Sequence, residues 1–348
     1  MKRQLTRTWG IGLAAIVAVA GLAGPASAAP ADRAASVTAQ TQGVAKGSAN
    51  ETFAQGPGPY EVASTKVNGD CRGLMGTIAK IVASDTGLRC SDAAPYGFSS
   101  PVSTTVYYPD SDEQTTYPVI DFVGGIFSND AQYETMARLW ASNGFIVTSS
   151  TDFVNSYPEM HVLGVLEARR LNDDPTSPLH GKVDLGRTIL AGHSAGAAAT
   201  LQSASFSPAI QKIIDPDLRV IAAMPIEPGP VALGSTLKVP TFVLTGAKDT
   251  VVPAWSWPLL TQMNLIRKVP AWSATADTAD HFSPVKTALS DNEFAGITTA
   301  FVLYQAYGDA EARSFFEGPA YRLAQDEQFI TSPLNPLRVR RNELAAAL

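Results

Sequence analysis

The chain has 348 residues, of which 45% are hydrophobic and 17% are charged, and its formal net charge is −6. This length is ordinary for an α/β enzyme built around a single sheet. The acidic balance argues against nucleic acid and anionic lipid as main partners.

The N-terminal segment has the features of an export signal. Lys2, Arg3 and Arg7 precede a short apolar run, and small residues follow it at 26–28. This pattern predicts a secretory signal peptide over residues 1–28, cleaved after about Ala28. The apolar run is shorter than the ~20 residues that a bilayer-spanning helix needs, and no later stretch is longer and equally apolar. We therefore expect a secreted protein without stable membrane insertion.

The remaining chain divides by composition. Residues 29–56 are rich in small and polar side chains, which predicts a flexible lead-in. A catalytic domain is expected over residues 57–310, and residues 311–348 form a C-terminal extension. Aromatic residues in the extension predict packing on the domain, whereas arginines near its end predict a solvated tail. The aromatic residues are Phe315, Phe316, Tyr321 and Phe329, and the arginines are Arg338, Arg340 and Arg341.

Cys71 and Cys90 are the two cysteines of the chain. An even count in an exported protein predicts one disulfide, worth on the order of 3 kcal/mol. Nothing beside either residue supports a catalytic or metal-binding thiol. The four histidines show no paired spacing, so we expect neither a metal site nor a cofactor.

Short apolar segments alternate with segments of helical periodicity along the domain. Strands are expected at residues 60–67, 102–108, 119–123, 145–148, 188–191, 220–224, 241–244 and 271–274. Helices are expected at residues 75–82, 130–143, 159–171, 195–204 and 294–307. This alternation predicts a mainly parallel sheet covered by helices on both faces, in a single domain.

The motif that carries the chemistry is Gly192-His193-Ser194-Ala195-Gly196, between a predicted strand and a predicted helix. Strand, G-x-S-x-G and helix together describe the nucleophile elbow of α/β-hydrolases, whose glycines permit the sharp turn that exposes the serine. We therefore expect Ser194 to be a nucleophile. The alternative is a glycine-rich turn that merely carries a serine.

A serine hydroxyl needs a base within hydrogen-bond reach, and in this fold the base follows the serine in the chain. His161 and His180 precede Ser194, and His193 lies inside the motif. Only His281 follows, in a loop after the last predicted strand. It is therefore the expected base.

The acid that orients the base is expected at the end of a strand between Ser194 and His281. Asp249 follows the predicted strand at 241–244 and meets this requirement. Asp277 and Asp280 are rivals by proximity to the histidine, but neither ends a strand.

Two backbone N–H groups should bind the oxyanion, one of them from the residue after the nucleophile, Ala195. The second should come from the loop at 124–127, where Ile126 is the expected donor and Phe127 the rival. Glycines at 124 and 125 let the backbone approach a substrate. Alternatively, they only relieve crowding at the strand end.

From about residue 56 to 307 the chain resembles the secreted bacterial cutinase-like polyester hydrolases, which include polyethylene terephthalate hydrolases and related esterase/lipases of the α/β-hydrolase superfamily. The segments that carry the resemblance are Thr105-Val106-Tyr107-Tyr108-Pro109, Ala141-Ser142-Asn143-Gly144-Phe145, Ser177-Pro178-Leu179-His180-Gly181-Lys182-Val183-Asp184, the elbow at 192–196, Val239-Pro240-Thr241 and Lys248-Asp249. The resemblance implies an α/β-hydrolase fold, with Ser194, Asp249 and His281 as the catalytic triad.

The chain also departs from this family pattern. Ile126 falls where the family often has an aromatic oxyanion residue, and Ala195 where it usually has methionine. The segment at 225–229 lacks the tryptophan that lines the family's acyl groove. We expect Phe127 and Trp255 to contact substrate, although Trp255 and its neighbour Trp257 are equally compatible with a place in the core. The family's disulfide lies near the C-terminus, unlike a bridge between Cys71 and Cys90.

These features predict a secreted serine carboxylic-ester hydrolase that acts through an acyl-enzyme. Short- or medium-chain esters, lipids and aliphatic polyesters are the expected substrates. One alternative is a phospholipase or another acyl hydrolase with the same triad. A second alternative is a non-catalytic binding protein that keeps the fold. The oligomeric state is left open.

Overall fold

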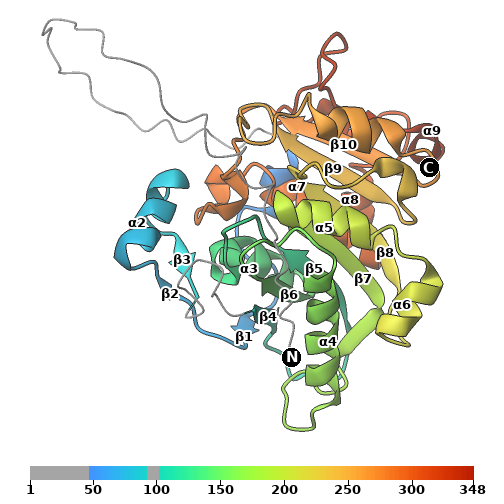
Figure 1. The fold of residues 1–348 in the computed structure, drawn as a ribbon. Helices are drawn as coiled ribbons and strands as arrows, with labels where there is room; N and C mark the ends of the chain where they lie inside the picture. Colours follow the sequence, from blue (N-terminus) through green and yellow to red (C-terminus); the bar gives the residue numbers. More distant parts are fainter. Residues whose placement is uncertain (1–46, 92–101) are drawn as a thin grey trace, which may run out of the picture. The chain divides into compact units, whose positions relative to one another are not determined.

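A nine-stranded sheet lies at the centre of the computed structural model, which describes residues 47–91 and 102–348. Its strands follow the order β1-β4-β6-β5-β7-β8-β9-β10-β11 (Figure 1). The six strands from β6 to β10 in this order run parallel, and antiparallel pairs flank them on both sides. The structure therefore confirms the mainly parallel sheet.

The strands of the main sheet are β1 (Val62–Ser64), β4 (Ser103–Pro109), β5 (Tyr117–Val123), β6 (Ile146–Thr151), β7 (Val183–His193), β8 (Val220–Ile226), β9 (Thr241–Gly246), β10 (Ala271–Ala276) and β11 (Arg340–Arg341). The helices are α1 (Ala49–Phe53), α2 (Gly73–Val82), α3 (Glu134–Ser142), α4 (Glu159–Asp173), α5 (Ala195–Ser203), α6 (Pro208–Ile214), α7 (Ala295–Tyr307), α8 (Ala310–Arg313) and α9 (Glu343–Ala346). Short 3₁₀ or π turns occupy Asp130–Tyr133, Gly234–Thr236, Pro258–Gln262, Met263–Leu265, Ser283–Val285, Leu289–Asp291 and Arg322–Gln325.

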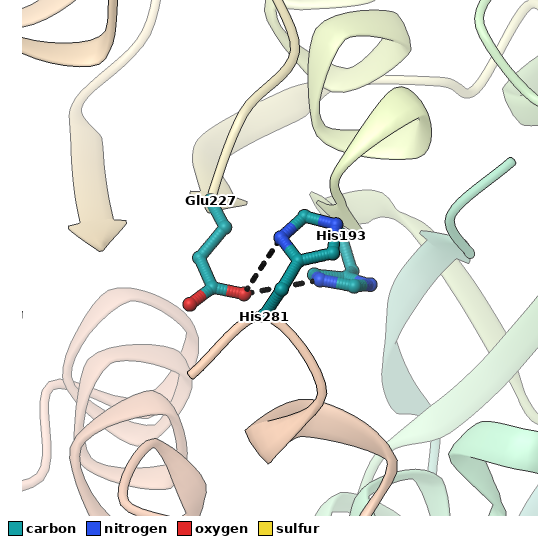
Figure 2. Close-up of side chains that lie close together, drawn as sticks. All are labelled: His193, Glu227 and His281. Carbon is teal, nitrogen blue, oxygen red and sulfur yellow. Dashed lines mark hydrogen bonds and ion pairs between the residues drawn. The ribbon is translucent and has the colours of Figure 1, made fainter. Parts of the chain in front are cut away.

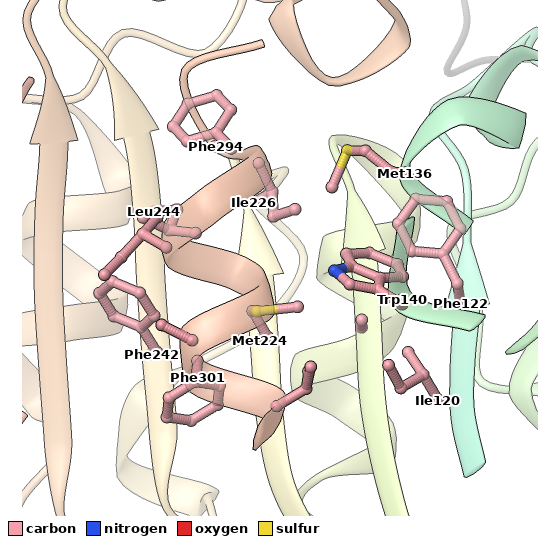
Figure 3. Close-up of a cluster of buried hydrophobic side chains, with 14 of the residues drawn as sticks. Ile120, Phe122, Met136, Trp140, Met224, Ile226, Phe242, Leu244, Phe294 and Phe301 are labelled. Atoms are coloured by element: carbon pink, nitrogen blue, oxygen red, sulfur yellow. The ribbon is translucent and has the colours of Figure 1, made fainter. Parts of the chain in front are cut away.

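Two apolar layers, one on each face of the sheet, form most of the core. Side chains of α3 and α7 pack against one face, where Trp140 and Phe301 are fully buried (Figure 3). Side chains of α4 and α5 pack against the other face, around Val165 and Leu201. Successive strand residues point to opposite faces, so strands buried on both sides read as continuous apolar runs. This is why β5, β8 and β9 could be predicted as buried strands.

The N-terminal boundary of the folded part differs from the expected one. The prediction of a flexible lead-in over residues 29–56 is wrong for residues 47–56. Within them, Ala49–Phe53 forms α1, which packs against α7. Ala49 is fully buried there, and a Cβ on Gly296 would lie 2.3 Å from its backbone. Small residues make this close helix contact, and Phe53 is the one large apolar side chain of α1, packed edge-on against Phe315. A single aromatic residue does not reveal a helix in the sequence. The predicted signal peptide, residues 1–28, lies outside the described residues.

The C-terminal segment completes the same sheet. Phe315 and Phe316 are fully buried in the main core, as their aromatic character predicts. The expected solvated tail is wrong, because Arg340 and Arg341 form β11 and pair with β10. The backbone of these arginines joins the sheet while their side chains remain partly exposed, and the guanidinium of Arg341 stacks over Tyr321. The charge of an arginine side chain does not reveal that its backbone pairs with the edge of a sheet.

A separate two-stranded sheet lies beside the disulfide. Cys71 and Cys90 are bonded to each other, as predicted, and β2 (Gly69–Asp70) pairs with β3 (Arg89–Cys90) beside the bond. The bridge closes a segment that contains α2. No helix in the described ranges is long and apolar enough to cross a membrane.

Candidate active site

Ser194 stands at the turn between β7 and α5. Its φ of 54° and ψ of −115° are unusual for a residue with a side chain. The turn is possible because residue 196 is glycine: a Cβ there would lie 2.0 Å from the carbonyl oxygen of Val123. The predicted strand-turn-helix arrangement is therefore present, with the serine at its tip.

Three of the predicted site residues meet at the carboxyl ends of the parallel strands. The Nε2 atom of His281 lies 3.0 Å from Oγ of Ser194, and its Nδ1 atom lies 2.8 Å from Oδ2 of Asp249. All three side chains are buried. The other oxygen of Asp249 accepts hydrogen bonds from two backbone N–H groups of the following turn, at 2.8 and 2.7 Å, which fix the carboxylate.

The two expected oxyanion donors belong to different segments, since Ala195 directly follows Ser194 and Ile126 lies in the loop after β5. Ala195 is the first residue of α5, where helix geometry leaves the N–H without an intrahelical acceptor. The rival donor Phe127 gives its N–H to the carbonyl of Phe153 at 3.1 Å. Ile126 is therefore the better placed of the two loop residues. The neighbouring Gly125 directs its own N–H to the hydroxyl of Tyr133 at 2.8 Å.

A mainly apolar cavity of about 520 Å³ opens beside Ser194. Ile126 and Phe127 line it on one side, and both side chains are about half exposed. The opposite wall comes from the disulfide segment: Met75, Ile78, Ala79, Val82, Ala83 and Leu88. Trp255 is absent from the described lining of this cavity and is 65% exposed, so its contact with substrate stays a prediction. Trp257 is only partly buried and donates its indole N–H to the carbonyl of Pro228 at 2.7 Å.

A buried acid that the sequence did not reveal lies behind the histidine. Glu227 follows β8 and is fully buried, and its Oε2 atom lies 3.1 Å from Nε2 of His193 and 3.6 Å from Nδ1 of His281 (Figure 2). Burial, followed by the charges of nearby carboxylates, raises the pKa of Glu227 well above its usual range. The one available signal was its position at the end of a strand, where parallel strands bring side chains together.

His193 is held between two partners. Its Nδ1 atom lies 2.8 Å from the hydroxyl of Tyr133, and its Nε2 atom contacts Glu227. Burial, and then the positive charge of His281, lowers the pKa of His193 well below its usual range, so the ring is neutral. Ligating atoms of His193, Glu227 and His281 lie within 4.8 Å of one another, a spacing that would suit a metal ion. Each of these nitrogens already has a protein hydrogen-bond partner, which accounts for the cluster without an ion.

The family model described as PET hydrolase-like matches residues 49–302. The chain belongs to this family. Among its relatives, Cutinase 2 of Thermobifida cellulosilytica and Cutinase cut1 of Thermobifida fusca are each 28% identical over 189 residues, which is 52% of this chain and 65% and 54% of those proteins. Bis(hydroxyethyl) terephthalate hydrolase of Streptomyces coelicolor is 27% identical over 228 residues, 65% of this chain and 67% of that protein.

The matches thus span between about half and two thirds of the relatives' own length. Membership of the PET hydrolase-like family agrees with the α/β-hydrolase fold and with the elbow at Ser194. The family match includes the disulfide segment and α2.

Proposed function

We propose that the chain is a secreted serine carboxylic-ester hydrolase. The observation that carries this proposal is the continuous contact from Ser194 through His281 to Asp249, with distances of 3.0 and 2.8 Å. This arrangement gives a serine both its base and the group that orients the base. Cutinases and an ester hydrolase among the relatives add support.

The proposed reaction runs through an acyl-enzyme. Oγ of Ser194 attacks the ester carbonyl carbon while its proton passes to Nε2 of His281. The backbone N–H groups of Ile126 and Ala195 bind the oxyanion, and His281 then protonates the leaving alkoxide. Water repeats the sequence and releases the acid. Asp249 holds the imidazole in position and stabilises its charged form.

The shape and lining of the cavity support an aliphatic acyl group as the preferred substrate part. Ile126 and the side chains of α2 offer flexible apolar walls, and Phe127, Tyr133, Phe153 and Phe282 add aromatic ones. Compared with the family pattern, residue 126 and the segment at 225–229 lack an aromatic side chain, and each such missing contact costs about 1 kcal/mol of stacking. We infer a preference for aliphatic esters, lipids or aliphatic polyesters over aromatic polyesters. A phospholipid remains compatible with the same cavity.

Labelling with a fluorophosphonate tests the chemistry directly. The wild-type protein should label and the Ser194→Ala variant should not, with both checked for folding by circular dichroism. Equal labelling of the two would exclude Ser194 as the nucleophile. A folded wild-type protein that does not label would favour the non-catalytic binding protein.

The substrate class is tested separately. p-Nitrophenyl esters of increasing chain length, followed by phospholipid vesicles and aliphatic polyester films, should give a rank order. The proposal predicts hydrolysis of short and medium esters. Activity on vesicles alone would indicate the phospholipase. Export is tested by recovering the protein, without residues 1–28, from the culture medium of its host.

A further inference from the structure

We propose that Glu227 is a second positioning acid of the active site, which carries a proton beside Asp249 and takes over the orientation of His281 when Asp249 is lost. The inference rests on the proposed hydrolase function. Its basis is the placement of a fully buried carboxyl group within 3.6 Å of Nδ1 of His281 (Figure 2).

The position of Glu227 is built into the sheet. It follows β8, and its backbone N–H donates to the carbonyl of Leu244 in β9 at 2.7 Å. Its φ of 49° lies in the left-handed region, which a residue with a side chain adopts only when its surroundings hold it there. Oε1 sits against Gly246, where an added Cβ would lie 2.7 Å from it. The end of β9 therefore leaves room for this carboxyl group.

The hydrogen bonds around His193 give one oxygen of Glu227 a donor. Gly125 donates to the hydroxyl of Tyr133, whose own proton therefore goes to Nδ1 of His193. The neutral ring then carries its proton on Nε2 and donates it to Oε2 of Glu227 at 3.1 Å. Glu227 is thus connected to the loop that precedes the expected oxyanion donor.

The surroundings of the other oxygen, Oε1, indicate that Glu227 carries a proton. Oε1 receives no hydrogen bond from the described residues, although it is buried. Unpaired buried carboxylate oxygens are costly, and Asp249 and Glu227 both lie beside Nδ1 of His281, at 2.8 and 3.6 Å. A proton on Glu227 satisfies both groups, because two adjacent carboxylates do not both ionise readily. Burial and the negative charges of Asp249, Asp280 and Glu293 all favour the protonated form.

Removing Asp249 changes this balance. The nearest negative charge is gone, so Glu227 ionises more easily, and its Oε2 already faces Nδ1 of His281. A carboxylate at this place can orient the imidazole and stabilise its positive charge. The two acids should therefore compensate for each other in a way that independent residues do not.

The experiment is a double-mutant cycle with Asp249→Ala and Glu227→Gln, read as kcat and KM on p-nitrophenyl butyrate over a pH series. We expect Asp249→Ala to lose less than the ~10⁴-fold in kcat seen when a triad acid is disabled without a substitute. Glu227→Gln should cost about tenfold or less alone and about 100-fold in the Asp249→Ala background, mainly in kcat. Activity of Asp249→Ala should also fall at low pH, where Glu227 takes up its proton.

Asp121→Asn is the matched control. Asp121 is another buried acid paired with a histidine, at 3.0 Å from Nδ1 of His161, outside the cavity. Asp121→Asn should change kcat by the same factor in the wild-type protein and in the Asp249→Ala variant. Equal factors for Glu227→Gln in both backgrounds would overturn the proposal. A wild-type protein without esterase activity or fluorophosphonate labelling would instead overturn the hydrolase function.

A second measurement needs no variant. In wild-type protein labelled with ¹³C at glutamate side chains, one carboxyl signal should remain in the protonated range at pH ~7, as expected for a fully buried acid. If every glutamate signal is ionised at that pH, Glu227 carries no proton and the proposal is wrong.

Discussion

Gly196 determines whether Ser194 can reach its conformation. The elbow brings this glycine against the carbonyl oxygen of Val123, 2.0 Å from where a Cβ would lie. We expect Gly196→Ala to lower the free energy of unfolding by about 1–3 kcal/mol through overpacking, and to displace the nucleophile. Urea unfolding and fluorophosphonate labelling measure the two effects.

Gly56→Ala is the control for this prediction. A Cβ at Gly56 meets no atom within 4 Å, and its φ lies outside the left-handed region. The substitution should leave stability within about 0.5 kcal/mol of wild type. If Gly196→Ala were equally harmless, the elbow would be less tightly packed than the contacts indicate.

The raised pKa of Glu227 predicts a pH-dependent contribution to stability. A carboxyl whose pKa is raised on folding is stabilising below its unfolded value, near 4.5, and this contribution is lost as pH rises through the folded pKa. Glu227→Gln cannot ionise. Its free energy of unfolding relative to wild type should therefore increase with pH, measured by urea unfolding. A difference that is constant with pH would contradict the raised pKa.

The sequence could predict the placement of Ser194 and His281 because chain order and strand ends restrict the choices. Asp249 was chosen over Asp277 by the same reasoning, and it is the acid that contacts the histidine. Glu227 could not be predicted, because neither its burial nor its distance to His281 is visible in a single sequence. The role of Trp255 stays a prediction, because proximity in sequence to Asp249 says nothing about the direction of a side chain.

The helix α2 forms a fixed wall of the cavity. The disulfide holds one end, and at the other end Asp85 accepts two hydrogen bonds from Thr287 while Lys286 donates to the carbonyl of Ala83. The second anchor lies only a few residues after His281. The hydrogen bonds of the second anchor therefore join this wall to the segment that follows the catalytic histidine.

Two isoleucines of α2 test whether this wall binds acyl chains. Ile78 lines the cavity, whereas Ile81 is 71% exposed and does not. Ile78→Ala should lower kcat/KM for long-chain p-nitrophenyl esters about tenfold, from the loss of ~1–2 kcal/mol of apolar contact, and leave acetyl esters little changed. Ile81→Ala is the matched control. Equal effects of both variants would place the acyl chain elsewhere.

The disulfide should stabilise α2 more than it stabilises the central sheet. Replacing both cysteines, Cys71→Ser with Cys90→Ser, removes a cross-link worth about 3 kcal/mol. We expect a lower melting temperature and a weaker preference for long acyl chains, whereas fluorophosphonate labelling of Ser194 persists. Complete loss of labelling would mean that α2 also supports the triad.

Elements with large apolar stripes, such as α3 and α7, could be predicted from the sequence. The helix at Pro208–Ile214 was missed because it is short and none of its apolar residues is buried, with Ile210 and Ile213 exposed. The predicted helix at 130–143 begins as a 3₁₀ turn, Asp130–Tyr133, before α3. The buried Tyr133 ends this turn, and its contact with His193 joins residues that are 60 positions apart in the sequence.

Both ends of the described chain pack on its core. α1 lies against α7, and β11 adds an antiparallel strand to β10. The alternation of strands and helices predicted the parallel centre of the sheet, since such connections need a crossover. It did not predict these edge additions, which consist of short segments with little apolar character.

Removing residues 340–348 tests the contribution of the C-terminal edge. Asn342 donates its backbone N–H to the carbonyl of Ala271 and accepts the N–H of Ala271 at its side-chain Oδ1. Its side-chain amide also donates to the carbonyls of Ile266 and Val269. Their loss should lower the free energy of unfolding by about 2–5 kcal/mol. The folded fraction should keep its esterase activity, because none of these groups touches the cavity. An unchanged melting temperature would show that β11 is dispensable.

The segment closed by the Cys71–Cys90 disulfide holds residues that shape the acyl cavity but none of the residues of the triad. His281 and Asp249 lie in loops that follow β10 and β9, whereas one wall of the acyl cavity lies within a single segment closed by the disulfide. Substitutions at Met75, Ile78 and Val82 in that wall can therefore change selectivity while the residues that contact Ser194 and His281 stay the same. Replacing the residues between the two cysteines together is therefore a direct way to change which esters the protein prefers.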